Sequence, residues 1–246
     1  MAFPRIFWPG SAGDSVELTG DAAHHLRQVL RVAPGAAVGL FDGRGHEWAG
    51  QIESVSRQSV RVAGLVPIAP VAEARVPVTL AVGVLKGDQM DAVVRDATML
   101  GVAAIVPMQT AHVTVPPRAW QSGAARGRWQ RVAVASATQC RRAVVPEVRA
   151  VTTFDECVRE PAAVRLMCVE PALVLAAGGA SVADWRTVPP PASVQILIGP
   201  EGGWSSAEVE QALAAGAQPM HLGPRTLRAE TTPVVALTMV WATWGW

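Results

Sequence analysis

Cysteine is scarce in this chain of 246 residues. The three cysteines, Cys140, Cys157 and Cys168, are odd in number and show no C-x-x-C spacing. A disulfide framework needs pairs of cysteines and a structural zinc site needs closely spaced ligands, so the sequence favours neither. The adjacent His24 and His25 have no cysteine or carboxylate cluster beside them, and we expect no metal. Free cysteines are typical of a reducing compartment, which predicts a cytoplasmic protein.

Hydrophobic runs of membrane-spanning length are also missing. Apolar residues make up 50% of the chain, which disfavours disorder. The most apolar run, residues 233–246, is shorter than the roughly 20 residues that cross a bilayer. The first residues lack the basic flank and apolar segment of a secretory signal. We therefore expect neither secretion nor a membrane partner.

Lysine is nearly absent, and one long stretch has no acidic residue. Lys86 is the only lysine, and neither Asp nor Glu occurs between Asp96 and Glu147. Guanidinium groups pair bidentately with phosphate, so an excess of arginine favours a polyanion such as nucleic acid. A solvated helix face is the alternative interpretation. The arginines of this stretch are Arg118, Arg126, Arg128, Arg131, Arg141 and Arg142.

Three common signatures of catalytic or nucleotide-binding loops do not occur. The chain has no G-x-x-x-x-G-K-[ST] loop, and the glycines of residues 199–203 do not follow the G-x-G-x-x-G pattern. ATP hydrolysis on a P-loop and a Rossmann dinucleotide site therefore lose support. The G-x-S-x-G turn of the α/β-hydrolases is missing as well.

Residues 1–72 read as a β-rich, barrel-like domain. Short apolar runs at 38–41, 48–52 and 60–66 alternate with turn residues, and Asp42-Gly43 is a hairpin signal. One helix is expected over residues 21–31, with Ala22, Leu26, Val29 and Leu30 on one side. Three prolines between residues 67 and 77 mark a linker, so we place a domain boundary between residues 72 and 73.

Residues 73–246 alternate between strand and helix patterns, which predicts an α/β domain with a largely parallel sheet. Strands are expected at 78–85, 103–106, 164–169, 196–198 and 218–222, and helices over the arginine-rich segment 118–142 and over 206–215. Residues 180–191 read as a loop.

Several helix starts carry capping signals. Thr153 with Glu156 and Ser205 with Glu208 have the spacing of capping boxes, and Trp204 with Val209 has that of a hydrophobic staple. Asp88 is expected to cap the helix that follows it. Thr232 and Pro233 are expected to cap and begin the last helix.

Two glycine-bearing segments, residues 196–204 and 222–231, follow strand patterns in the second half of the chain. If their strands are neighbours in a parallel sheet, both loops face one crevice at the carboxyl ends of the strands. Gly202 and Gly203 leave the backbone open to a close ligand. Four charged residues flank the loops, and they are Glu201, Arg225, Arg228 and Glu230. They are candidates for a chemical role at the site, and the alternative is that they form ion pairs that hold the loops in place.

The motifs Leu197-Ile-Gly-Pro-Glu-Gly-Gly-Trp-Ser205 and Leu222-Gly-Pro-Arg-Thr-Leu-Arg-Ala-Glu-Thr231 closely resemble the two cofactor loops of the ribosomal RNA small-subunit methyltransferase E family, in the SPOUT superfamily. Other landmarks of the family occur in the same order, so the resemblance covers nearly the whole chain. They are His25-Leu-Arg-Gln-Val-Leu-Arg31, Phe41-Asp-Gly-Arg-Gly45, Lys86-Gly-Asp-Gln-Met-Asp91, Gln139-Cys-Arg141 and Val145-Pro-Glu-Val148.

This resemblance implies an α/β fold: a small PUA-like β-barrel followed by a SPOUT methyltransferase domain with a trefoil knot, working as a homodimer. It implies methyl transfer from S-adenosylmethionine to N3 of a uridine in 16S ribosomal RNA, either naked or within the assembled small subunit, with no metal required. Two alternatives stay open, which are a transfer RNA target and a non-catalytic RNA-binding protein with a vestigial pocket.

The resemblance also assigns residues. Arg228 is expected to stabilise the uridine anion, and Glu230 to orient Arg228 or accept the proton. RNA contacts are expected from Arg5, Arg27, Arg31, Arg44, Arg141 and Arg142. The expected cofactor-binding residues are Leu197, Ile198, Gly199, Pro200, Glu201, Gly202, Gly203, Leu222, Gly223, Arg225, Leu227, Arg228 and Thr231.

The chain departs from the family pattern at a few positions. Trp204 replaces the usual Phe and Ala229 a common Thr, while Thr232 stands where a small apolar residue is common. Cys140 occupies a position where Ser is frequent. These changes concern fine contacts and leave the expected cofactor unchanged.

Overall fold

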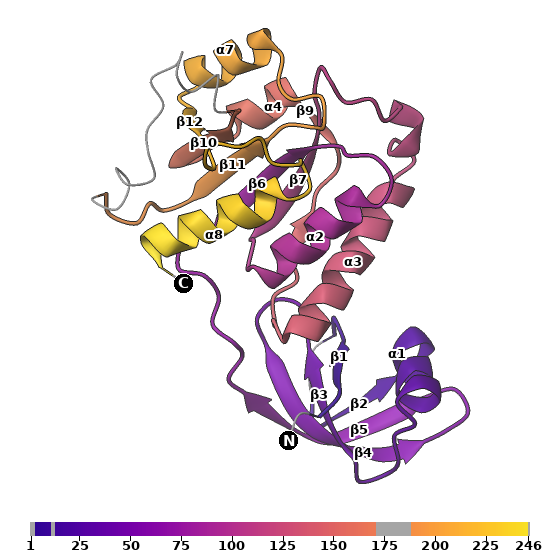
Figure 1. Cartoon of the computed structure of the whole chain (residues 1–246). Helices are drawn as coiled ribbons and strands as arrows, with labels where there is room; N and C mark the ends of the chain where they lie inside the picture. The colour runs from indigo at the N-terminus through magenta and orange to yellow at the C-terminus, as the bar shows by residue number, and fades with distance from the viewer. Residues whose placement is uncertain (1–2, 11–12, 171–187, 246) are drawn as a thin grey trace. The chain divides into compact units, whose positions relative to one another are not determined.

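The computed structural model describes residues 3–10, 13–170 and 188–245 (Figure 1). Within these ranges the chain forms two compact units. The first contains residues 1–72 together with 137–145, and the second contains residues 73–136 and 146–246. The end of the arginine-rich segment thus groups with the first unit, although the expected boundary assigned it to the second.

The first unit is a curled sheet in the order β1-β3-β4-β5-β2. Strands β3 and β4 are antiparallel and follow each other through the turn at Asp42-Gly43, which confirms the expected hairpin. Gly43 has φ 79°, a conformation that favours glycine. The strands are β1 (Arg5–Phe7), β2 (Ser15–Leu18), β3 (Ala37–Phe41), β4 (Glu47–Val55) and β5 (Val60–Ile68).

The helix of the first unit is confirmed, but its exposed side differs from the prediction. Helix α1 (Gly20–His24) continues directly into a π-helical segment, η1 (His25–Val29). A π-helical turn holds more residues than an α-helical turn, so the residues that follow rotate around the axis. Val29 and Leu30 consequently lie 61% and 40% exposed, although both were expected on the apolar side with Leu26.

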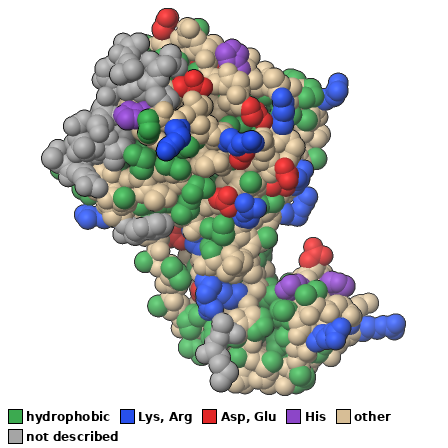
Figure 2. All heavy atoms as spheres, viewed as in Figure 1, with side chains coloured by type: hydrophobic (Ala, Val, Ile, Leu, Met, Phe, Trp, Pro, Cys, Tyr) green, Lys and Arg blue, Asp and Glu red, His purple; other side chains and the backbone are tan. Residues whose placement is uncertain are grey.

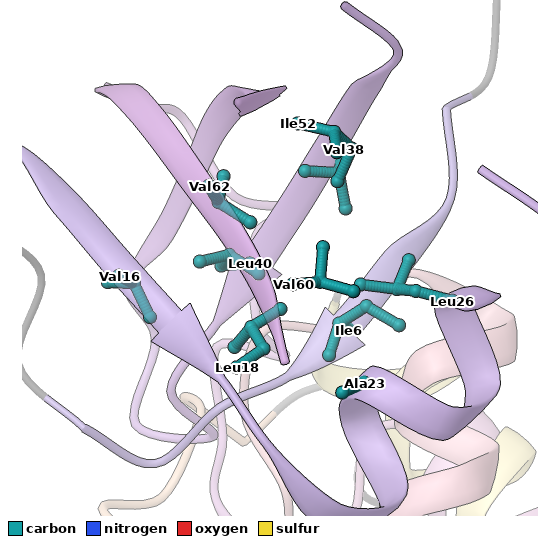
Figure 3. Packing of buried hydrophobic residues seen from close by; sticks show 10 residues of the cluster. All are labelled: Ile6, Val16, Leu18, Ala23, Leu26, Val38, Leu40, Ile52, Val60 and Val62. Carbon is teal, nitrogen blue, oxygen red and sulfur yellow. The ribbon is translucent and has the colours of Figure 1, made fainter. Parts of the chain in front are cut away.

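Packing of the first unit joins this helix to the concave side of the sheet. Ala23 and Leu26 are fully buried against aliphatic side chains of the strands. Figure 3 shows these side chains pointing toward one another from the strands and the helix. The other members of this core are Ile6, Val16, Leu18, Val38, Leu40, Ile52, Val60 and Val62.

The second unit contains a parallel sheet in the order β12-β10-β11-β6-β7-β8, with β9 paired to β7, as the strand and helix alternation predicted. The two glycine loops follow β11 and β12, which are not neighbours, because β10 lies between them. The strands are β6 (Val78–Gly83), β7 (Ala104–Gln109), β8 (Glu147–Val148), β9 (Thr152–Thr153), β10 (Val164–Cys168), β11 (Val194–Ile198) and β12 (Gln218–Met220). The part of the expected loop 180–191 up to residue 187 lies outside the described residues.

Helices cover both faces of this sheet (Figure 1). On one face, α4 (Phe154–Arg159) and α7 (Ser206–Ala214) pack against a shared core. Leu197 of β11 belongs to this core. Because successive strand residues point to opposite faces, the residues before and after it point to the other face of the sheet. There α8 (Thr232–Trp244) contacts both β11 and α2 (Gln89–Met99). The arginine-rich segment forms η2 (Pro117–Ala119) and α3 (Ala124–Cys140).

Three of the four helices begin directly after the N-cap residue that the sequence predicted. Both capping boxes form, at Thr153 with Glu156 and at Ser205 with Glu208. Asp88 is the N-cap residue of α2, as predicted, but its side chain makes no capping hydrogen bond. The last helix begins one residue early, with Thr231 as the N-cap, and the Thr232 hydroxyl donates to the Arg228 carbonyl instead.

The Glu156 capping box gives a testable titration. Hydrogen bonds from the Thr153 backbone and from the Thr152 and Thr153 hydroxyls lower the pKa of Glu156 to about 2. Because the folded pKa lies below the unfolded one, this bonding stabilises the fold above about pH 4.5 and is lost as the pH falls toward 2. We expect an NMR titration to find the Glu156 carboxyl ionised at pH 3. A midpoint at its ordinary value of 4.5 contradicts the capping geometry.

Candidate active site

A cavity of about 420 Å³ lies at the carboxyl ends of the second unit's strands, a size typical of small-molecule sites. Four adjacent strands, β12, β10, β11 and β6, are each followed by residues that line it. This is the edge at which parallel sheets bind ligands. The lining residues are Gln89, Cys168, Val169, Glu170, Ile198, Gly199, Pro200, Glu201, Gly202, Gly203, Trp204, Leu222, Arg225, Thr226, Leu227, Arg228, Ala229, Glu230 and Thr232.

The loop after β11 is held in place by Trp204. Its indole nitrogen donates to the Cys168 carbonyl over 2.8 Å, and its ring packs against Phe154 with the centroids 5.3 Å apart. Trp204 and Val209 pack against the same core, consistent with the predicted staple. A Cβ on Gly199 would lie 3.2 Å from the Trp204 ring. The tryptophan ring, which replaces the usual phenylalanine of position 204, therefore lies directly against Gly199.

Gly202 is a glycine for a reason that the sequence did not reveal. A Cβ added there would lie 2.8 Å from the Cβ of His112, on the loop that follows β7. The missing side chain makes room for His112, and Gly202 also lines the cavity, where its backbone stays open to a ligand as we expected. Gly203 requires glycine through its backbone, since its φ is 69°.

The loop after β12 carries the two residues that were expected to be catalytic. The Arg228 carbonyl accepts hydrogen bonds from the backbone N–H groups of Thr231 and Thr232, each over 3.0 Å. These bonds anchor the Arg228 backbone at the start of α8 while its side chain is 83% exposed. Glu230 is only 23% exposed, and its carboxylate lies 3.9 Å from the Arg228 guanidinium. The pair is loosely coupled, and the guanidinium is available to a ligand at the cavity wall.

Most of the residues expected to bind the cofactor line the cavity, and three do not. Leu197 is fully buried in the core shared with α4 and α7. Thr231 is the N-cap of α8, and Gly223 provides a turn with φ 97°. The lining residues that were predicted neither as binding nor as catalytic residues are Gln89, Cys168, Val169, Glu170, Trp204, Thr226, Ala229 and Thr232.

Two of these additional residues indicate which chemistry and which ligands the cavity favours. Burial raises the pKa of the Cys168 thiol to about 12, so the thiol stays protonated and is a poor nucleophile. The Gln89 side-chain oxygen is buried and has no hydrogen-bond partner among the described residues. An unpaired buried acceptor is costly, so this oxygen favours a ligand that donates a hydrogen bond.

Part of the positive charge of the arginine-rich segment is neutralised by acidic residues. Arg126 pairs with Glu147 at 3.3 Å, and Arg128 pairs with Asp91, and both acids come from outside the acid-free stretch. On the visible face of the second unit, acidic and basic side chains are interspersed (Figure 2). The interpretation of α3 as a solvated helix face therefore gains support.

The six arginines expected to contact RNA all belong to the first unit but differ in exposure. Arg31, Arg44 and Arg141 are exposed, and Arg27 is half-buried and donates to the Arg57 carbonyl. Arg5 and Arg142 are buried, with 7% and 5% of their surface exposed. The Arg5 guanidinium is bound to Glu47 and to backbone carbonyls, so it holds the fold together and is not presented to RNA.

Within the described ranges, no three His, Cys, Asp or Glu residues cluster as metal ligands would. None of the helices in the same ranges is long and apolar enough to cross a membrane.

The fold is that of an RNA methyltransferase domain joined to a PUA domain. A family model described as an RNA methyltransferase domain matches residues 72–241, and one described as an RNA methyltransferase PUA domain matches residues 18–63. The chain belongs to the ribosomal RNA small subunit methyltransferase E family.

Relatives and solved structures agree with this assignment. The methyltransferase E of Synechocystis is 33% identical over 98% of this chain and 77% of its own length. The crystal structure of the Neisseria gonorrhoeae enzyme bound to S-adenosylmethionine has a TM-score of 0.89 at 27% identity, covering 99% of this chain and 98% of the other. A putative methyltransferase of Legionella pneumophila, in complex with the same cofactor, has a TM-score of 0.87 at 31% identity and covers 98% of each chain.

Proposed function

We propose that this protein transfers a methyl group from S-adenosylmethionine to N3 of a uridine in 16S ribosomal RNA. The observation that carries the proposal is the cavity between the loops after β11 and β12, with Arg228 and Glu230 in its wall. The relatives support it, since they are small-subunit ribosomal RNA methyltransferases and two related structures contain the cofactor.

The residues of the cavity fit this cofactor. Ile198, Leu222 and Leu227 offer apolar surface for the adenine ring, while residues 199–203 offer backbone groups to its polar edge. The unpaired Gln89 oxygen can accept from the hydroxyl or amino groups that the cofactor carries. When bound, S-adenosylmethionine supplies a methyl group activated by its sulfonium. The loops, which are held by the bonds of Trp204 and of the Arg228 carbonyl, contribute alignment, and orientation can supply roughly 7 to 11 kcal/mol of a barrier.

The remaining chemistry concerns the uridine, which must lose the proton on N3. The negative charge then spreads onto the two ring carbonyl oxygens, and a fixed positive group beside them stabilises it. Arg228 is suited to this role because its guanidinium is exposed while its backbone is anchored. Glu230 lies 3.9 Å away and can orient Arg228 or accept the proton.

The RNA is held by the exposed arginines of the first unit, and Arg44 and Arg141 give a direct test. Each contact to a phosphate releases counterions, so the logarithm of the affinity falls with the logarithm of salt concentration. We expect Arg44→Ala and Arg141→Ala each to weaken RNA binding and to reduce the salt slope by about one unit. Arg126→Ala is the matched control, because Arg126 is paired with Glu147. An unchanged salt slope in both test variants would remove these arginines from the interface.

The resemblance to the family carries further parts of the proposal, namely a homodimer, a cytoplasmic location, a trefoil knot in the second unit and the assembled small subunit as one possible substrate. Light scattering on the purified protein tests the dimer, for which the proposal requires twice the 25.8 kDa mass of one chain.

Labelled S-adenosylmethionine tests the function against its alternatives. The purified protein is incubated with total RNA, with isolated small subunits and with transfer RNA, and the fraction that acquires label is identified. Label in ribosomal RNA supports the proposal, and label only in transfer RNA changes the target. A protein that binds RNA but neither binds the cofactor nor transfers label is a binding protein with a vestigial pocket.

A further inference from the structure

We propose that His112 is a positioning residue that fixes the Gly202–Gly203 peptide for cofactor binding. This inference rests on the proposed function, because it concerns the same cavity. His112 is not among the residues that line the cavity, and it follows β7, which is separated from β11 by β6 in the sheet. It acts on the cofactor loop indirectly, through its contact with Gly202.

The contact between His112 and Gly202 is both polar and steric. The His112 Nδ1 atom lies 2.9 Å from the Gly202 carbonyl oxygen. A carbonyl only accepts, so Nδ1 carries the proton and donates it. The Cβ position of Gly202 lies 2.8 Å from the His112 Cβ, which leaves no room for a side chain between the two loops. Both contacts therefore depend on glycine at position 202.

The loop that carries His112 is itself anchored next to this contact. The Ala111 N–H donates to one carboxylate oxygen of Glu208 over 2.8 Å. The other oxygen accepts from the Ser205 N–H over 2.9 Å and closes the capping box of α7. Glu208 is only 7% exposed, so it links the two loops through a buried carboxylate. His112 is thus held at a defined distance from the cofactor loop.

The peptide group between Gly202 and Gly203 is fixed at both of its ends. Its carbonyl accepts from His112, and its N–H donates to the Pro200 carbonyl over 2.9 Å. Glycines readily adopt several backbone conformations, and Gly203 is in the left-handed region with φ 69°. Without His112, one of the two bonds that select this peptide orientation is lost. The cofactor would then have to order the peptide on binding, which lowers its affinity.

Three variants of the full-length protein separate the hydrogen bond from the bulk of the side chain. In His112→Asn the amide nitrogen takes nearly the place of Nδ1 and can donate to Gly202. In His112→Gln the amide lies one carbon farther out, and His112→Ala has no donor. We expect His112→Ala and His112→Gln to bind S-adenosylmethionine roughly 3- to 10-fold more weakly by calorimetry, the effect of one hydrogen bond, and His112→Asn to bind as the wild type does.

Kinetics and amide exchange add measurements that a general loss of stability would not reproduce. The KM for the cofactor should rise with its Kd, while kcat at saturating cofactor and the KM for RNA stay unchanged. In the protein without ligand, the Gly203 amide should exchange faster in His112→Ala than in the wild type, at equal Tm. Equal cofactor affinity in all variants, or equal losses in His112→Asn and His112→Ala, would overturn the proposal. A wild-type protein that binds no cofactor would instead overturn the proposed function.

Discussion

Arg228→Ala is expected to lower kcat by about 100- to 1000-fold, the loss typical of removing one group that stabilises a developing anion. The Kd for S-adenosylmethionine should change little, because the Arg228 side chain is 83% exposed at the cavity wall. The anion forms when uridine N3 loses its proton, so the variant should also need a higher pH for its remaining activity. Single-turnover rates across pH, with cofactor binding measured in parallel, test both effects.

Arg225→Ala and Arg228→Lys are the matched controls. Arg225 lines the same cavity on the same loop but is not assigned to the uridine, so its loss should affect the Kd for the cofactor more than kcat. Lysine at position 228 keeps the charge but not the planar fork of the guanidinium, and it should recover part of the lost rate. Unchanged turnover in Arg228→Ala would remove this residue from the mechanism and leave the uridine anion without an assigned partner.

Arg5→Leu should lower the free energy of unfolding by about 3 to 5 kcal/mol, the usual cost of leaving one partner of a buried ion pair without its counter-charge. Arg5 binds both carboxylate oxygens of Glu47, at 2.6 and 3.0 Å. The same guanidinium donates to the carbonyls of Ala137 and Arg142 and lies 4.3 Å from the centre of the Phe41 ring. Urea denaturation measures the loss directly.

Arg61→Leu is the control for the Arg5 experiment. Arg61 also pairs with a glutamate, Glu53, but both side chains are about half exposed. Exposed pairs contribute at most about 1 kcal/mol, so this variant should be nearly as stable as the wild type. Arg5→Leu combined with Glu47→Leu removes both buried charges and should be more stable than Arg5→Leu alone. Equal losses in Arg5→Leu and Arg61→Leu would contradict the assigned role of Arg5.

Local signals in the sequence predicted local structure well. The capping boxes at Thr153 and Ser205 form because their partners lie three residues away, within one helical turn. The exceptions also have local causes. The π-helical turn in residues 25–29 rotates Val29 to the surface, and Thr232 bonds to the Arg228 carbonyl instead of capping its helix.

Contacts between distant parts of the chain could not be predicted in the same way. Arg5 appeared to be one more arginine available to RNA, because its partner Glu47 is 42 residues away. The contact between Gly202 and His112 could not be predicted either, because the two residues are 90 positions apart and no neighbouring residue indicates it. The position of β10 between β11 and β12 depends on how the whole sheet is ordered, and this brought Cys168 and Glu170 into the cavity.

The site itself was found because its residues are continuous in sequence. Two short loops supply most of the cavity wall, and both keep the motif of the family. Gln89 lies in a further family landmark, 86–91, but nothing in its spacing indicated that its side-chain oxygen is buried without a partner. Only the three-dimensional arrangement shows that the start of α2, which follows β6, contributes to the same cavity.

The identity of the methylated nucleoside tests the central claim most directly. The wild-type protein is incubated with S-adenosylmethionine carrying a labelled methyl group and with small ribosomal subunits or 16S ribosomal RNA that lack the modification. The RNA is then digested to nucleosides and separated by chromatography with mass detection. We expect the label to elute as 3-methyluridine and Arg228→Ala to slow its appearance greatly. Label on another atom or another base, or no transfer by a protein that is folded and supplied with both substrates, would contradict the proposed function.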